Sequence, residues 1–301
     1  MCTARNVYYA LAGTVVALLV AAAVWPAALR AQAGSHERTM FVSTADAKGD
    51  PVEGLGPNDF IVREDGQRRE ILRVSRAVEP IDIALLVDTS AAVSNAITPM
   101  RQALTSFVGL MAGDNQIAIV GLADRPTILS DYTSNRGLLD KAIGRVFAMS
   151  GSGMTLLDAI WEVSSGLKRR EATRAEIVVV ITAGAEFTNR YAKDVIAAVR
   201  GAGAGLHAIV VGVIGGTDPE ERERAQVLDE GTRTTGGQHV TLLTDIALDQ
   251  ALRRLARELA SQYKVVYGRP ESLIPPEKIE VASGRAGVTM RGTPARGQGG
   301  A

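Results

Sequence analysis

Two oxygen-bearing side chains at the end of an apolar segment are the clearest candidates for a functional site. Residues 83–87 are aliphatic and have the length of a buried strand, and Asp88 and Ser90 follow them directly. A helix-forming segment that starts near Ser94 comes next. In α/β sheets this layout places polar side chains at the carboxyl end of a strand and beside a helix N-terminus, where ligand and ion sites lie. The segment therefore predicts a ligand or ion site at one edge of a sheet.

The elements that position this site alternate between apolar strands and amphipathic helices. Segments such as 177–181 are apolar throughout, as expected when helices cover both faces of a mostly parallel sheet. The fold class predicted is α/β, doubly wound and mostly parallel. The predicted strands are 81–88, 116–122, 126–130, 176–182, 206–213 and 238–243. The predicted helices are 95–112, 136–147, 155–168, 191–201, 219–234 and 245–261.

Strand-like segments without helices flank this unit on both sides. In the first flank, Asp65-Gly66 separates two such segments, and both residue types tolerate the positive φ angles of a hairpin turn. Because the chain ends of a domain tend to lie close together, we expect the flanks to pair into one small β module. The predicted boundaries are 37–78 and 263–291 for the flanks, 79–262 for the α/β unit, and 292–301 for a loose tail.

Composition and the N-terminus bound the function. Of 301 residues, 46% are hydrophobic, Lys+Arg and Asp+Glu number 33 each, and no basic run stands out, so nucleic-acid binding is not predicted. Residues 6–29 are uncharged, and Ala31-Gln32-Ala33 fits signal peptidase. Residues 1–33 are thus predicted to be a signal peptide or, since the apolar run can span a bilayer, an uncleaved N-terminal anchor. Either predicts an exported protein, periplasmic or secreted, with membrane contact only through an uncleaved anchor.

Several motifs resemble those of the von Willebrand factor A (VWA) domain. Residues 88–92 are similar to its Asp-x-Ser-x-Ser loop, 150–160 to its Gly-Gly-Thr-x-x-x-Asp-Ala segment and 182–184 to its Thr-Asp-Gly loop. Segments 46–66 and 263–281 are similar to the exported bacterial VWFA-related proteins of the acidobacterial type. The resemblance implies a VWA fold and an Mg²⁺ ion held by oxygen ligands from the three loops. In members with an intact site, a carboxylate from a protein partner completes the metal shell.

This chain departs from the family pattern at the metal site. Ala92 replaces a hydroxyl ligand, Ala183 replaces a carboxylate, and Met154 stands where the family has threonine. The predicted metal ligands that remain are Asp88, Ser90 and Thr155. Without the second carboxylate, less negative charge offsets the cost of dehydrating Mg²⁺, so we expect weak Mg²⁺ binding at most and no other cofactor. Ligand counting predicts that restoring Ala92→Ser and Ala183→Asp together creates Mg²⁺-dependent stabilisation.

Other polar residues near these loops have simpler interpretations. Glu186 is interpreted as a solvated loop charge rather than a replacement ligand. Asp158 is expected to be a helix residue, and Ser94 an N-cap or first-turn residue. His207 is expected to be a core or strand-end histidine. Residues 201–205 follow a helix and precede a strand, so their glycines indicate helix termination rather than a phosphate loop.

The sequence favours binding over catalysis. It contains no zinc-ligand spacing, no P-loop and no identifiable Ser/His/Asp or Cys/His set, so we do not expect an enzyme. The function predicted is an exported protein-binding module for adhesion or assembly, with a degenerate metal-ion-dependent adhesion site and a protein partner at the cell envelope. A structural envelope component with a vestigial site is the alternative. An exported hydrolase is the weakest alternative.

Overall fold

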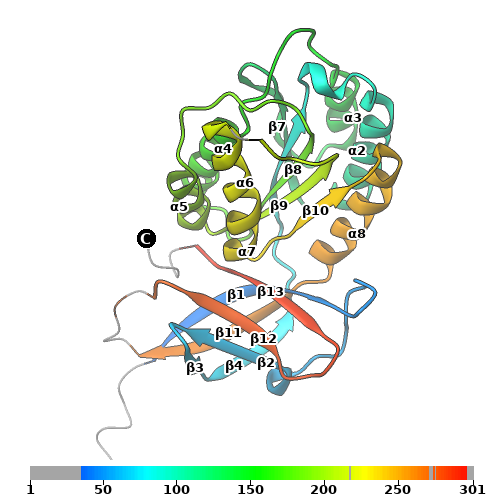
Figure 1. Cartoon of the computed structure of the whole chain (residues 1–301). Coiled ribbons are helices and arrows are strands. Elements are labelled where there is room, and N and C mark those ends of the chain that lie inside the picture. Colours follow the sequence, from blue (N-terminus) through cyan, green and yellow to red (C-terminus); the bar gives the residue numbers. More distant parts are fainter. Residues whose placement is uncertain (1–34, 217, 271–273, 275, 297–301) are drawn as a thin grey trace, which may run out of the picture.

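The computed structural model describes residues 35–216, 218–270, 274 and 276–296, so the predicted signal or anchor segment lies outside the described residues. An α/β unit lies above a smaller all-β part (Figure 1). None of the helices in these residues has both the length and the apolar character needed to cross a bilayer.

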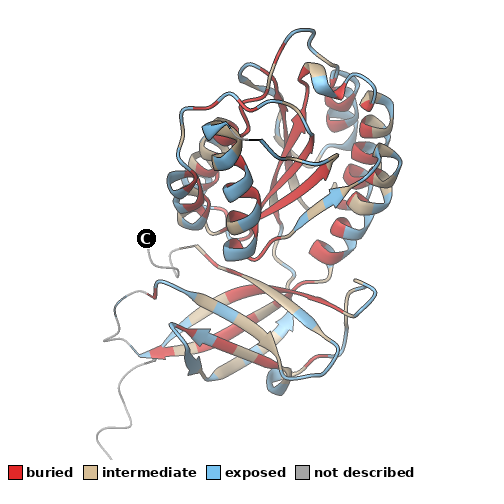
Figure 2. Cartoon of the chain, in the orientation of Figure 1, coloured by how far each residue is buried: buried red, intermediate tan, exposed pale blue. Residues whose placement is uncertain are grey.

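A six-stranded sheet forms the centre of the α/β unit. Its strands lie in the order β10-β9-β8-β5-β6-β7, parallel to one another except for β7, which runs antiparallel to β6 at one edge. The fully apolar strands lie in the middle of the sheet and are buried (Figure 2). The predicted fold class is confirmed. The strands are β5 (Asp82–Asp88), β6 (Gln116–Leu122), β7 (Pro126–Thr133), β8 (Ala175–Thr182), β9 (Ala204–Val211) and β10 (His239–Leu242).

Helices cover both faces of this sheet and create two hydrophobic cores. Along β5, Leu85 and Val87 point into one core, and Ala84 and Leu86 into the other, because successive strand residues face opposite sides. The first face carries α2 (Ile97–Met111), α3 (Arg136–Gly144) and α8 (Leu248–Ala260). The second carries α4 (Leu156–Arg170), α5 (Ala192–Ala202) and the continuous segment α6 (Pro219–Gln226), η4 (Val227–Gly231) and α7 (Thr232–Thr235).

The two flanks pair with each other in the β module, which we define as the seven strands outside the α/β unit. One sheet has the order β13-β1-β11-β4 and the other the order β12-β2-β3, so both contain strands from each flank. The expected pairing of the flanks is therefore present. The strands are β1 (Ser35–Ala45), β2 (Phe60–Glu64), β3 (Gln67–Arg69), β4 (Ile71–Arg76), β11 (Tyr263–Pro270), β12 (Ile279–Ser283) and β13 (Thr289–Pro294).

One turn and the last strand of the β module can be compared with the predictions. The predicted hairpin joins β2 to β3, and both Asp65 (φ 48°) and Gly66 (φ 81°) adopt the left-handed conformation. The predicted loose tail is wrong at its start, because residues 292–294 belong to β13 and pair with β1. The Thr293 hydroxyl also donates to the Thr235 carbonyl at 2.8 Å, which ties this strand to the α/β unit. Residues 297–301 lie outside the described residues.

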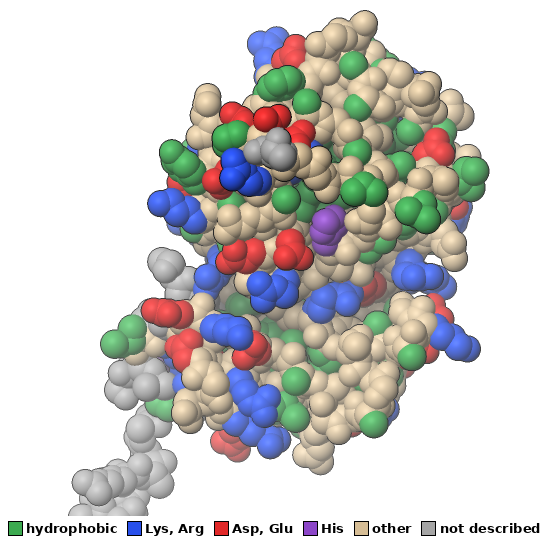
Figure 3. Space-filling model, in the orientation of Figure 1, with side chains coloured by type: hydrophobic (Ala, Val, Ile, Leu, Met, Phe, Trp, Pro, Cys, Tyr) green, Lys and Arg blue, Asp and Glu red, His purple; other side chains and the backbone are tan. Residues whose placement is uncertain are grey.

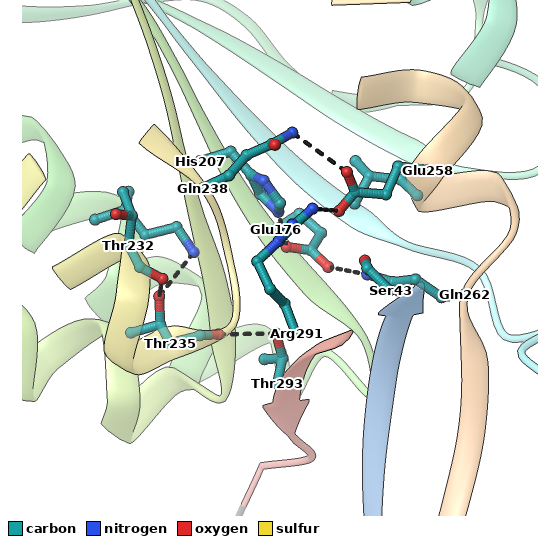
Figure 4. A network of polar contacts seen from close by, with 12 residues as sticks. Ser43, Glu176, His207, Thr232, Thr235, Gln238, Glu258, Gln262, Arg291 and Thr293 are labelled. Carbon is teal, nitrogen blue, oxygen red and sulfur yellow. Dashed lines mark hydrogen bonds and ion pairs between the residues drawn. The ribbon is translucent and has the colours of Figure 1, made fainter. Parts of the chain in front are cut away.

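A buried polar network joins the β module to the amino ends of β8 and β9 (Figure 4). The Glu176 carboxylate accepts a hydrogen bond from Gln262 Nε2 at 3.1 Å through one oxygen and lies 3.1 Å from His207 Nε2 through the other. Gln262 also donates to the Ser43 hydroxyl at 3.1 Å and accepts from Arg174 Nε at 2.9 Å. These contacts fix the position of the β module on the α/β unit.

Candidate functional site

Asp88 ends β5 at the carboxyl edge of the sheet and is fully buried, with 0% of its surface exposed. Its Oδ1 atom accepts a hydrogen bond from the Ser90 backbone N–H at 2.8 Å. Its Oδ2 atom accepts from the Thr182 backbone N–H at 3.0 Å and from the Thr182 hydroxyl. Both carboxylate oxygens are therefore bonded to the protein's own donors, and the bonds link the first and third loops of the predicted metal site.

The two predicted hydroxyl ligands also have internal partners. Ser90 is the N-cap of the short 3₁₀ helix η3 (Ala91–Val93), and its hydroxyl oxygen accepts from the Ala92 N–H at 3.3 Å. The Thr155 hydroxyl donates to the Ala123 carbonyl at 3.0 Å. Asp88 and Ser90 thus lie side by side in the first loop, while the Thr155 hydroxyl is bonded to the loop after β6.

Apolar and backbone atoms occupy the remaining family positions. Met154 is fully buried and forms a parallel backbone bridge with Glu186, which ties the second loop to the third. A Cβ atom added at Gly184 would lie 3.0 Å from the Ala92 Cβ and 3.5 Å from Ser90 Oγ. The third loop therefore packs directly against the first.

Glu186 lies inside the protein, so its interpretation as a solvated loop charge is wrong. Only 3% of it is exposed, and its Oε1 atom accepts from the Leu157 N–H at 3.2 Å, at the N-terminus of α4. Burial raises the pKa of Glu186 to about 7, against the lowering effect of that N–H and of the nearby Arg224 charge. Its Oε2 atom has no hydrogen-bond partner within the part of the chain that the structure describes.

Sequence reasoning missed Arg224, a basic residue beside this edge. It is the only buried residue of α6 and is 1% exposed. Its guanidinium donates to the Gly184 carbonyl, and Nη2 lies 3.9 Å from Glu221 Oε1. Burial lowers the pKa of Arg224, and the charges of Glu186, Glu221 and Asp88 act in the opposite direction. A guanidinium is therefore a cation whose charge acts on these carboxylates.

This arrangement does not fit a magnesium ion. Mg²⁺ requires near-octahedral oxygen ligands that are free to coordinate it. Here one carboxylate and two neutral hydroxyls remain: both Asp88 oxygens accept internal hydrogen bonds, Ser90 Oγ accepts from the Ala92 N–H, and the Thr155 hydroxyl donates to a carbonyl. Within the described residues, no group of three or more His, Cys, Asp or Glu side chains is placed to hold a metal.

The other candidate residues have structural contacts. Asp158 lies in the first turn of α4 and pairs with Arg190 Nε at 2.7 Å. Ser94 is not an N-cap, because it ends η3 and its hydroxyl donates to the Ala91 carbonyl at 2.6 Å. His207 is buried in β9, as expected of a core histidine. Helix α5 ends at Gly203, which has a left-handed φ of 65° and confirms helix termination in residues 201–205.

Large apolar side chains are exposed on the loops around this edge. They include Phe147 and Met149 before α4, Phe187 and Tyr191 before α5, and Val213 after β9. The Phe187 ring lies across Gly153, where an added Cβ would be 1.8 Å from a ring carbon. We call these five exposed side chains the apolar rim.

Among the cavities along the described part of the α/β unit, two differ clearly in their lining. A cavity of about 450 Å³ beside the apolar rim is lined mainly by apolar atoms, with Leu129, Phe147 and Met149 among its walls. A second, of about 510 Å³, lies between the α/β unit and the β module and is lined by Arg233, Lys278 and neighbouring charged groups. Along this border Lys and Arg side chains alternate with Asp and Glu (Figure 3). Because the lining of the second cavity carries charges of both signs, it favours neither an anionic nor a cationic ligand.

Comparison with known proteins finds a family match within the α/β unit. Residues 83–186 match the family model described as von Willebrand factor type A domain. This part of the α/β unit is therefore similar to a VWA domain. The match spans all three loops of the predicted metal site.

Solved structures resemble this chain at low sequence identity. A von Willebrand factor type A protein from Catenulispora acidiphila is 11% identical with a TM-score of 0.49, and the alignment covers 88% of this chain and 75% of that one. The PilB minor pilin from Streptococcus sanguinis, as a D319A mutant, is 10% identical with a TM-score of 0.45, covering 61% and 62%. The vWF domain of the type V pili tip protein Mfa5 from Porphyromonas gingivalis is 13% identical with a TM-score of 0.47, covering 61% and 96%. No curated protein matches the chain.

Proposed function

We propose that the carboxyl edge of the sheet is a protein-binding surface that works without a metal ion. The observation that carries this proposal is the apolar rim, in which Phe187 is 59% and Tyr191 62% exposed. Exposed apolar clusters rimmed by polar groups are typical of interaction sites, and aromatic side chains provide much of the binding energy at protein interfaces. The rim surrounds a polar centre in which the Asp88 carboxylate and the Ser90 and Thr155 hydroxyls already have internal partners.

The chemistry of the edge favours contact through shape and apolar area. A partner carboxylate has no metal to bind here, and the Asp88 carboxylate is buried and repels a second negative charge. An apolar side chain of a partner instead fits the 450 Å³ cavity between Leu129, Phe147 and Met149. This favours a protein partner that inserts a large apolar residue.

The location and use of the module belong to the same proposal. The similarity of segments 46–66 and 263–281 to exported bacterial VWFA-related proteins supports a role outside the cytoplasm. The partner is then a protein of the cell envelope, and the role is adhesion or assembly. The uncharged segment 6–29 supports export, by cleavage or by anchoring.

Site-specific crosslinking tests this function. A photo-reactive phenylalanine at position 187 should form a discrete adduct with an envelope protein, whereas the same group at Leu110, on the far part of α2, should form none. Phe187→Ser together with Phe147→Ser should weaken binding of the identified partner by at least about 30-fold, the effect of losing about 2 kcal/mol. Leu110→Ser is the matched control. Equal adducts from positions 187 and 110 would overturn the proposal.

A further inference from the structure

Helix α6 contains a buried arginine in an otherwise solvent-facing, highly charged segment. Arg224 is 1% exposed, while its neighbour Arg222 is exposed. Burying a guanidinium removes its hydration and is unfavourable unless nearby groups compensate for it. Groups in the surrounding loops must therefore compensate for the buried charge of Arg224.

The compensation comes from the groups of the VWA metal site. Arg224 donates to the carbonyl of Gly184, the residue that packs against Ser90 and Ala92. Asp88 and Glu186 are both buried and lie close enough for their charges to act on the guanidinium. The hydrogen-bond donors to Asp88 itself come from Ser90 and Thr182 and are neutral.

We propose that the Arg224 guanidinium takes the place of the metal ion in this VWA domain, holding the third loop against the first and excluding Mg²⁺. The count of charges supports this exchange. Relative to the family pattern, Ala183 removes one negative carboxylate from the site, and Arg224 supplies one fixed positive charge near the Asp88 carboxylate that remains. A divalent ion placed beside a buried guanidinium would be repelled strongly in a medium of low dielectric constant. The inference concerns the interior of the edge and does not depend on the proposed protein partner.

This assignment changes what restoring the lost ligands should do. Ligand counting alone predicts that Ala92→Ser with Ala183→Asp is sufficient for Mg²⁺ binding. With Arg224 in place, the double variant should still not respond to Mg²⁺. Binding should appear only when Arg224→Ala is added to the two substitutions.

The test compares melting temperatures with and without 10 mM Mg²⁺ in the full chain. For the triple variant with Arg224→Ala, Mg²⁺ at about 100 times its dissociation constant should raise the melting temperature by about 5 °C or more. The double variant and the control triple variant with Arg222→Ala should shift by less than about 1 °C. Calorimetry with MgCl₂ provides the dissociation constants.

Two outcomes overturn the proposal. One is an Mg²⁺-dependent shift in the double variant, or in the Arg222→Ala control, as large as that of the Arg224→Ala triple variant. The other applies if the Arg224→Ala triple variant is unfolded without the ion. The proposal then requires that Mg²⁺ restores the near-ultraviolet circular dichroism of this variant. Failure of Mg²⁺ to restore it, both there and in the Arg224→Gln version, counts against metal replacement.

Discussion

The two edges of the central sheet both bury charged side chains, but they satisfy them differently. At the amino edge, both carboxylate oxygens of Glu176 have direct partners, Gln262 and His207, at 3.1 Å. At the carboxyl edge, Glu186 has one bonded oxygen, and Arg224 Nε has no hydrogen-bond partner among the described residues. At the amino edge the atom without a partner among the described residues is His207 Nδ1, on a side chain whose Nε2 is paired. At the carboxyl edge the carboxylate and the guanidinium are themselves only partly bonded, so the amino edge resembles a structural joint more closely.

The surfaces around the two edges also differ. The amino edge is covered by the β module, whereas the carboxyl edge is surrounded by the apolar rim. In open α/β sheets, ligand sites lie outside the carboxyl ends of the strands. Proteins commonly depart from optimal stability at functional sites. The contrast predicts that substitutions at the amino edge reduce stability, while some at the carboxyl edge increase it.

The largest effect is expected for Glu176→Ala at the amino edge. The substitution leaves Gln262 and His207 without their buried partner, and each unsatisfied group costs about 1–3 kcal/mol. The free energy of unfolding, measured with urea, should fall by about 3 kcal/mol.

A surface carboxylate in the same region is the control for this prediction. Glu171 is mostly exposed and lies 3.4 Å from Arg296 Nη2. Exposed ion pairs contribute little, so Glu171→Ala should change the free energy of unfolding by about 0.5 kcal/mol or less. Equal effects of the two substitutions would show that the amino edge is not the joint described above.

At the carboxyl edge, Glu186 should make stability depend on pH. Burial raises its pKa from the ordinary value of 4.5 to about 7. The folded protein therefore holds this proton more tightly than the unfolded chain, and its contribution is fully present below pH 4.5 and is lost as the pH rises to 7. The loss amounts to about 3 kcal/mol for a shift of this size.

Glu186→Gln removes this titration and should flatten the pH profile of stability. The variant should be more stable than the parent protein at pH 8, by up to about 3 kcal/mol, with the advantage vanishing at pH 4.5. Urea unfolding at four pH values from 4.5 to 8 measures the difference. Glu171→Gln serves as the exposed control and should leave the profile unchanged. A Glu186→Gln profile parallel to that of the parent would contradict the buried position of this carboxylate.

The architecture was predictable because its signals are local. The fully apolar segments became β5, β8 and β9, and the helix that starts near residue 245 shows a clear apolar face. The Asp65-Gly66 turn required only two residues. In each case the period or composition of a short segment decides the structure, and no distant contact has to be known.

The interior of the candidate site was only half predictable. The loss of ligands at Ala92 and Ala183 is visible in the sequence, but their replacement is not. Helix α6 has almost no apolar face, so nothing in its sequence distinguishes the buried Arg224 from the exposed Arg222. The burial of Glu186 likewise depends on its bond to the N-terminus of α4, a contact between loops 29 residues apart.

The smallest effects on stability are expected when single hydroxyl groups are removed at the carboxyl edge. One of these hydroxyls is bonded to a carboxylate and the other to a neutral carbonyl. Thr182→Val removes a hydroxyl that donates to the Asp88 carboxylate, whereas Thr155→Val removes one that donates to the neutral Ala123 carbonyl. Hydrogen bonds to charged groups are worth more, so the losses in unfolding free energy should be about 2 and about 1 kcal/mol. Valine matches the shape of threonine, which limits cavity effects. If Thr155→Val costs as much as Thr182→Val, Asp88 does not act as the buried charge of this edge, and the charge balance with Arg224 fails with it.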